Sequence, residues 1–191
     1  MRKSTSVLSA AIIVIVGFLY GIASAQEKTV IDTYKNGNPR ITKFSVDKTA
    51  PDGFVIKKNT EYEQYESGKS KRATLAADWQ IPDGPVLKAG EVEFYEDGKT
   101  KKAVLAKDFE LPNGFVIKAG TVHEMYPNRM FKIVVPARDY YGPDGITAKA
   151  GTQFEQFENG KIKRATLVSG WTMPDGTVIK AGEVYKQDNA D

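Results

Sequence analysis

Two consecutive stretches decide the fold of this chain, because the second repeats the first. Residues 65–94 have the sequence YESGKSKRATLAADWQIPDGPVLKAGEVEF, and residues 95–124 have the sequence YEDGKTKKAVLAKDFELPNGFVIKAGTVHE. Sixteen of these 30 positions are identical without a gap. A match of this extent identifies an internal repeat, which is the sequence signature of a repeat architecture.

The repeat covers most of the chain. A third clear copy begins at Phe157, and two more diverged copies begin at Tyr34 and Tyr126. The aromatic residues that open the copies recur every 30 or 31 positions. We therefore expect five copies over residues 34–185, with an N-terminal tail at 26–33 and a C-terminal tail at 186–191.

Two turn signals in each copy predict β-hairpins. The first is a pair such as Asp97-Gly98, which favours a tight turn whose two central residues have positive φ. The second is a proline turn such as Pro82-Asp83-Gly84. Strand-length runs such as Phe115-Val116-Ile117 lie between the turns, and no stretch after the N-terminal segment shows a helical apolar stripe. About three short strands per copy are predicted.

The fold class follows from this repeat length. A propeller blade needs four strands and commonly about 40 residues or more, and these copies are shorter. We predict an all-β protein: a linear, solenoid-like antiparallel array of β-hairpin repeats, with about five copies of 30–31 residues.

The N-terminus has the layout of a secretory signal peptide. A basic start at Met1-Arg2-Lys3 precedes an apolar run over residues 7–20 and the small residues Ala23-Ser24-Ala25. We expect residues 1–25 to be removed before Gln26 and the protein to be exported to the periplasm or the extracellular space. A retained membrane anchor is the alternative, although the apolar run is shorter than the roughly 20 residues of a spanning helix.

Composition removes several function classes. The 27 basic and 24 acidic residues give a formal net charge of +3, so nucleic acid is not an expected partner. The chain has no cysteine, which excludes disulfides, thiolate metal sites and a cysteine nucleophile. A single histidine excludes any constellation that needs two. We expect no cofactor, no metal and no catalytic residue.

The opening motif of the copies resembles a known repeat. Tyr95-Glu96-Asp97-Gly98-Lys99 and Phe157-Glu158-Asn159-Gly160-Lys161 are similar to the tyrosine-x-asparagine-glycine core of MORN-type repeats. They also resemble bacterial exported proteins built from "FYxxGKxKxxxLAxD" units. The resemblance spans all five copies, but MORN units are shorter and lack the added proline turn. It implies an elongated antiparallel β array used for binding or scaffolding.

Equivalent aromatic residues stand three positions before the turn prolines, with Lys48 in the first copy. We interpret them as a hydrophobic spine, because aromatic rings bury the largest apolar area. The alternative is an exposed platform on which glycans stack. These candidate residues are Trp79, Phe109, Tyr140 and Trp171.

A complete column of lysines recurs once per copy. Such a column is a candidate site for an anionic polymer: lipopolysaccharide, teichoic acid or an acidic glycan. The alternative is a solvated face that keeps sheets from pairing further, because acidic residues such as Glu91 and Glu183 are interleaved. The column consists of Lys57, Lys88, Lys118, Lys149 and Lys180, and a partial second basic column of Arg72, Lys102 and Arg164.

A column of aspartates precedes the lysines by 10 residues. We expect these carboxylates to cap the turn that leads to the next strand, rather than to bind calcium, since no copy has the dense spacing of a calcium loop. A hairpin between the two columns also predicts ion pairs such as Asp78 with Lys88. The aspartates are Asp47, Asp78, Asp108 and Asp139, and Gly170 takes the last position.

Two features break the regularity. His123 stands in a column that is otherwise apolar or aromatic, so we expect a packing role. The fourth copy has Arg129 in place of the turn glycine and carries Arg138-Asp139-Tyr140-Tyr141, so a site that is not repeated in every copy is expected there.

These observations favour a non-enzymatic exported protein that binds or scaffolds at the cell envelope. The alternative is a carbohydrate- or polyanion-binding module that uses the aromatic or the lysine column. A hydrolase with paired carboxylates remains a third hypothesis. The expected partners are an envelope glycan, an anionic polymer or another protein.

Overall fold

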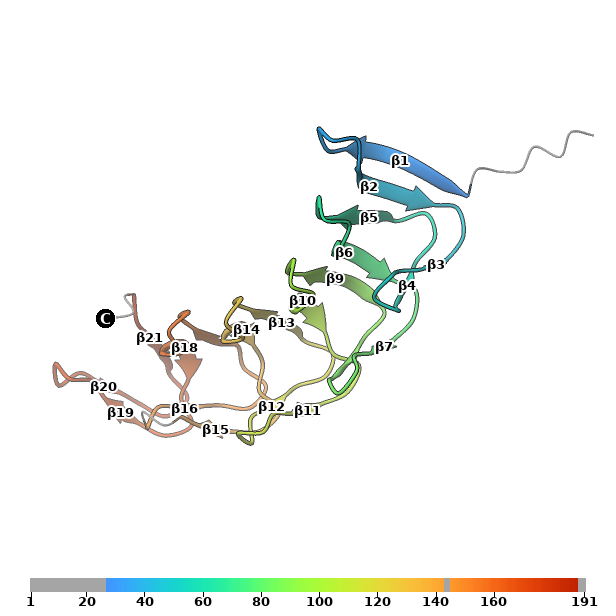
Figure 1. The fold of residues 1–191 in the computed structure, drawn as a ribbon. Coiled ribbons are helices and arrows are strands. Elements are labelled where there is room, and N and C mark those ends of the chain that lie inside the picture. The colour runs from blue at the N-terminus through green and yellow to red at the C-terminus, as the bar shows by residue number, and fades with distance from the viewer. Residues whose placement is uncertain (1–26, 143–144, 189–191) are drawn as a thin grey trace, which may run out of the picture.

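The structure is a computed structural model that describes residues 27–142 and 145–188. Within these ranges the chain is all-β, with 21 strands and no helix. The predicted signal peptide and the end of the C-terminal tail lie outside the described residues. Figure 1 shows a curved row of hairpins that does not close on itself, so the prediction of a linear array is confirmed.

The main sheet has 13 strands, and eleven of them follow one another in sequence order, each antiparallel to its neighbours, while the other two belong to the first short hairpin and join through the pairing of Ile56 with Leu75. The eleven are β1 (Lys28–Thr33), β2 (Pro39–Phe44), β5 (Glu61–Gln64), β6 (Ser70–Leu75), β9 (Gly90–Phe94), β10 (Thr100–Val104), β13 (Val122–Met125), β14 (Phe131–Val134), β17 (Phe154–Gln156), β18 (Ile162–Thr166) and β21 (Val184–Lys186). Each copy adds two strands, so successive copies are roughly 10 Å apart along the sheet.

A short two-stranded hairpin follows each long one and lies along the outer side of the curve (Figure 1). The pairs are β3 (Lys48–Thr49) with β4 (Val55–Ile56), β7 (Trp79–Gln80) with β8 (Val86–Leu87), β11 (Phe109–Glu110) with β12 (Val116–Ile117), β15 (Tyr140–Tyr141) with β16 (Thr147–Ala148), and β19 (Trp171–Thr172) with β20 (Val178–Ile179). Each copy thus has four strands rather than the predicted three, because the residues on both sides of the proline turn pair.

The long hairpins turn at the aromatic-x-x-glycine segment that opens each copy. The amide of Gly98 donates to the carbonyl of Tyr95 at 2.9 Å, and Gly98 has a φ of 84°. Asp97 is not among the residues with positive φ, so only the glycine takes the left-handed conformation. The turn is therefore a type I turn followed by a left-handed glycine, and the register shift between Thr100 and Lys102 follows it. The predicted turn with two positive φ angles is wrong.

The hydrophobic core fills the space between the main sheet and the short hairpins. Each main strand alternates between the two faces, so every second side chain points to this core. The short hairpins supply large residues that are almost fully buried, such as Phe54 and Leu87 at 0% exposure. The main strands supply Ala73, Leu75 and Phe154 at 1% each.

The ends of the array differ from the predicted boundaries. Residues 28–33, expected in a tail, form β1, which pairs with β2 over Lys28–Phe44 and Thr33–Pro39. At the other end β21 continues to Lys186. The first hairpin therefore begins one strand before Tyr34, because the opening aromatic of each copy belongs to the turn and not to the start of a hairpin.

Candidate functional site

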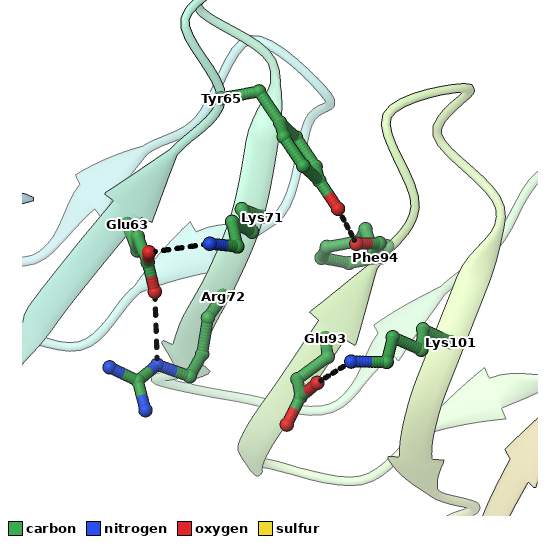
Figure 2. A pocket seen from close by; sticks show the side chains of 7 residues that line it. All are labelled: Glu63, Tyr65, Lys71, Arg72, Glu93, Phe94 and Lys101. Atoms are coloured by element: carbon green, nitrogen blue, oxygen red, sulfur yellow. Dashed lines mark hydrogen bonds and ion pairs between the residues drawn. The ribbon is translucent and has the colours of Figure 1, made fainter. Parts of the chain in front are cut away.

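The solvent-facing side of the main sheet carries charges that compensate one another. Figure 2 shows an open hollow in which Lys71 contacts Glu63 at 2.8 Å and Lys101 contacts Glu93 at 2.8 Å. Arg72 also lies 3.6 Å from Glu63. The hydrogen bond from Lys101 holds the pKa of the Glu93 carboxyl below its usual range. These charged side chains form ion pairs with one another, so few charges on this face are free to bind a ligand.

The same pairing continues in the later copies. Lys132 contacts Glu124 at 2.7 Å, and Arg164 contacts Glu155 at 3.7 Å. In the partial basic column, Arg72 and Arg164 are thus paired. Lys102 has no ion pair within 4.0 Å in residues 27–142 and 145–188.

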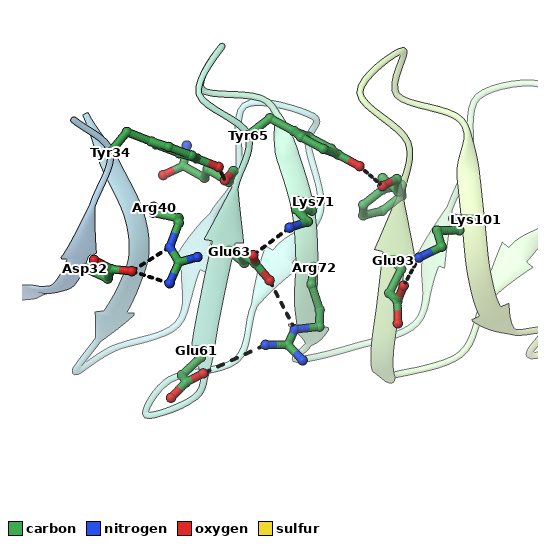
Figure 3. Close-up of polar contacts among 12 residues, drawn as sticks. Asp32, Tyr34, Arg40, Glu61, Glu63, Tyr65, Lys71, Arg72, Glu93 and Lys101 are labelled. Atoms are coloured by element: carbon green, nitrogen blue, oxygen red, sulfur yellow. Dashed lines mark hydrogen bonds and ion pairs between the residues drawn. The ribbon is translucent and has the colours of Figure 1, made fainter. Parts of the chain in front are cut away.

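The opening tyrosines join successive hairpins. The hydroxyl of Tyr34 donates to the carbonyl of Gln64 at 2.7 Å, and that of Tyr65 donates to the carbonyl of Phe94 at 2.9 Å (Figure 3). Two further bonds follow, from Tyr95 to Met125 at 2.7 Å and from Tyr126 to Gln156 at 3.3 Å. The sequence marks these residues by their period, but it gives no sign that the hydroxyl spans two hairpins.

The lysine column lies at the other end of the main strands. Each lysine directly follows a core residue of a short hairpin, such as Leu87 before Lys88, and therefore faces away from the core. All five are exposed, and none has an ion pair within 4.0 Å in the described part of the chain. We call these residues the lysine ladder: Lys57, Lys88, Lys118, Lys149 and Lys180.

The aspartate column binds backbone instead of lysine side chains. Oδ1 of Asp78 accepts from the amide of Ala89 at 2.8 Å, and Oδ1 of Asp108 accepts from the amide of Ala119 at 2.7 Å. Asp47 and Asp139 make the same bond, at 2.7 and 2.8 Å. The capping prediction is confirmed. The predicted ion pair between Asp78 and Lys88 is wrong: the two side chains are not within 4.0 Å, and the carboxylate instead binds the amide that directly follows the lysine.

The four column aromatics are half-buried and pack against the core. Trp79 meets Phe54 edge-on with ring centroids 5.4 Å apart, and Tyr140 meets Phe115 in the same way at 4.8 Å. A side-chain carbon built on Gly145 would come within 3.0 Å of the Trp171 ring, so this indole packs on Gly145 of the preceding copy. Phe109 also packs on the core. The rings contribute to packing, as a spine requires, and keep part of their surface in solvent.

His123 packs inside the array. It is 3% exposed, like its column neighbours Tyr62 and Val92, and burial lowers its pKa to about 4. Its Nδ1 has no hydrogen-bond partner in the ranges that the structure describes. His123 therefore packs in the core as a neutral side chain, as expected from its column.

Among the described residues of the irregular fourth copy, the side chains singled out above do not gather into one site. Arg129 holds a φ of 71° at an exposed hairpin tip. Arg138 lies 3.8 Å from Glu110 of the preceding copy, and Tyr141 is 67% exposed on the short hairpin. These side chains point into solvent from separate turns and strands.

One buried polar cluster was not anticipated. Ser70 is 2% exposed, its Oγ lies 2.8 Å from the Tyr62 hydroxyl, and it also bonds the Asp52 carboxylate. Burial raises the pKa of Tyr62. The equivalent of Ser70 in the next copy is Thr100, so the aligned copies gave no signal of this cluster. It ties the first proline turn to the main sheet.

Among the described residues, no three histidine, cysteine, aspartate or glutamate side chains are grouped closely enough to hold a metal ion. No helix in residues 27–142 and 145–188 has the length and apolarity needed to cross a membrane. No protein-family description, curated protein or solved structure matches the chain.

Proposed function

We propose that the protein is a non-enzymatic binding or scaffolding module, exported to the cell envelope, whose periodic surface engages an extended partner. The observation that supports this proposal most is that each copy presents the same exposed, unpaired lysine at the same place in the fold. Such a surface repeats once per copy, or roughly every 10 Å.

A periodic surface suits a periodic ligand. Each contact between one copy and one unit of a polymer is weak, but contacts made in series act at a high effective concentration. A small molecule would gain nothing from the repetition, since it can occupy only one copy at a time. The geometry therefore favours a linear polymer over a metabolite.

A length series tests this function. Linear oligomers of defined length, both neutral glucans and anionic chains, are titrated against the purified chain in a calorimeter. We expect affinity to rise with oligomer length until the ligand spans the array, roughly 40 Å for five ladder positions. Equal affinity for short and long oligomers, or binding of none of them, would contradict the proposal.

Export is tested separately. Mass spectrometry of the protein recovered from the envelope or the medium should give a chain that begins at Gln26, because the small residues at Ala23 and Ala25 suit signal peptidase. A chain that retains residues 1–25 would contradict removal of the signal.

A further inference from the structure

We infer that the lysine ladder is the ligand-binding surface, and that its ligand is a linear polymer with singly charged anionic groups, either carboxylates or phosphodiesters. This inference rests on the proposed function and names the ligand class. It follows from four properties of the ladder: spacing, freedom of the side chains, fixed backbone and charge chemistry.

The spacing keeps the five ammonium groups apart. Successive lysines are separated by two strands, or roughly 10 Å, which is close to the Debye length at physiological salt. Their mutual repulsion is therefore largely screened when no ligand is bound. An extended chain can place an anion near each lysine without crowding its own charges.

The ladder lysines have no ion pair within 4.0 Å among the described residues, unlike three lysines on the open face of the main sheet. Lys71, Lys101 and Lys132 each contact a glutamate within 2.8 Å. Oδ1 of Asp78 and of Asp108 accepts from a main-chain amide, and no carboxylate of the described residues lies within 4.0 Å of the Lys88 or Lys118 ammonium. A ligand anion can thus approach the ladder without first displacing a carboxylate.

The backbone beneath the ladder is fixed. The amide of Lys88 donates to the carbonyl of Val104 at 2.8 Å, and that of Lys118 donates to the carbonyl of Val135 at 2.9 Å. The carbonyl of Lys118 also accepts from the Thr121 hydroxyl at 2.7 Å, a bond repeated at Lys57 and Lys149. On the protein's side only side-chain freedom is lost when a ligand binds, because no backbone has to be ordered, and this lowers the entropic cost of binding.

The residue type suits a run of separate single charges. Lysine carries a compact point charge that does not fix the orientation of an anion, whereas the planar fork of arginine holds a carboxylate or a phosphate in one bidentate geometry. Every ladder position holds lysine. The residue three positions after each ladder lysine is threonine in three copies and glutamate in two, Glu91 and Glu183. Glu91 is exposed and stands three residues after Lys88, so we expect its charge to lower the attraction for an anion there.

The experiment compares two triple variants of the full mature chain. The ladder variant is Lys88→Gln, Lys118→Gln, Lys149→Gln. The control is Lys35→Gln, Lys69→Gln, Lys161→Gln, which removes the same charge from exposed hairpin-tip lysines that have no ion pair within 4.0 Å among the described residues. The probes are oligogalacturonates, poly(glycerol phosphate) of matched length and a neutral glucan, titrated over a salt series.

We expect the ladder variant to lose roughly 100-fold in affinity for the anionic probes at low salt, at about fivefold per lysine, and the control to lose far less. The slope of log affinity against log salt should fall by up to about one per lysine removed. Glu91→Gln should bind several-fold more tightly, a gain that misfolding cannot imitate. The two anionic probes distinguish a carboxylate ligand from a phosphodiester ligand.

Three results overturn the inference. Equal losses in the two triple variants would assign binding to net charge alone. Unchanged affinity of the ladder variant, with the length dependence retained, would move the ligand to another face and leave the proposed function standing. Absence of length-dependent binding by the unaltered chain would remove both.

Discussion

Replacing Tyr95 by phenylalanine should lower the free energy of unfolding by about 1 kcal/mol. The substitution removes one hydrogen bond, from the Tyr95 hydroxyl to the Met125 carbonyl at 2.7 Å, and an intramolecular bond of this kind contributes about 0.5–1.5 kcal/mol net. The ring itself should still fit, because the fifth copy has Phe157 in the same column.

The loss should also weaken coupling along the array. The stability of a repeat protein is approximately the sum of the intrinsic stabilities of its units and the interaction energies between neighbouring units. The bond from Tyr95 to Met125 contributes to an interaction between neighbours. Trp79 and Trp171 lie on either side of it, so single-tryptophan variants made by Trp79→Phe or Trp171→Phe report on separate halves. Urea unfolding followed by fluorescence should give coincident transitions in the parent and separated transitions after Tyr95→Phe.

Two further tyrosines calibrate the result. Tyr126→Phe should cost less, since its hydroxyl lies 3.3 Å from its acceptor. Tyr141→Phe removes a hydroxyl from a ring that is 67% exposed and should change stability by less than about 0.5 kcal/mol. If Tyr95→Phe is indistinguishable from Tyr141→Phe in both stability and cooperativity, the hydroxyls do not couple the hairpins.

Three other outcomes are expected. Burial lowers the pKa of His123 to about 4 in the folded protein, so the unfolded chain takes up a proton below pH 6.5 that the folded protein does not. The free energy of unfolding should therefore fall by about 3 kcal/mol as the pH is lowered from 6.5 to 4. His123→Val should remove this part of the pH dependence of the urea midpoint. Trp79→Ala should cost about 2–3 kcal/mol in urea unfolding, less than for a fully buried ring, and a loss under about 0.5 kcal/mol would instead indicate an exposed platform. Arg129→Gly should raise the free energy of unfolding by up to about 1 kcal/mol, and with it the melting temperature, since a φ of 71° strains arginine and not glycine. A lower melting temperature would show that the arginine side chain makes a stabilising contact.

The architecture was predictable because the copies act as their own alignment. Recurrence of Asp97-Gly98 and the proline turns located the hairpins, and the column of Asp78 and Asp108 located the caps. Such features depend on residues within about a dozen positions of each other. Local signals of this kind survive in any sequence that folds into hairpins.

What was missed depends on contacts between copies or on competition between partners. The Tyr65 hydroxyl reaches a carbonyl 29 residues away, and no local pattern encodes that distance. The ion pair expected for Asp78 and Lys88 does not form, and Oδ1 of Asp78 accepts instead from the amide of Ala89. The strand at residues 28–33 was hidden because it precedes the first opening tyrosine and so falls outside the aligned unit.

The arrangement of the main sheet has a consequence for how such a gene can change. Each unit inserts two antiparallel strands, so β1 and β21 point the same way for any number of units. Loss or duplication of one unit by unequal recombination would leave both ends of the protein unaltered and every interior neighbour relationship intact. The length of the array can therefore increase or decrease by one unit at a time while the fold stays the same.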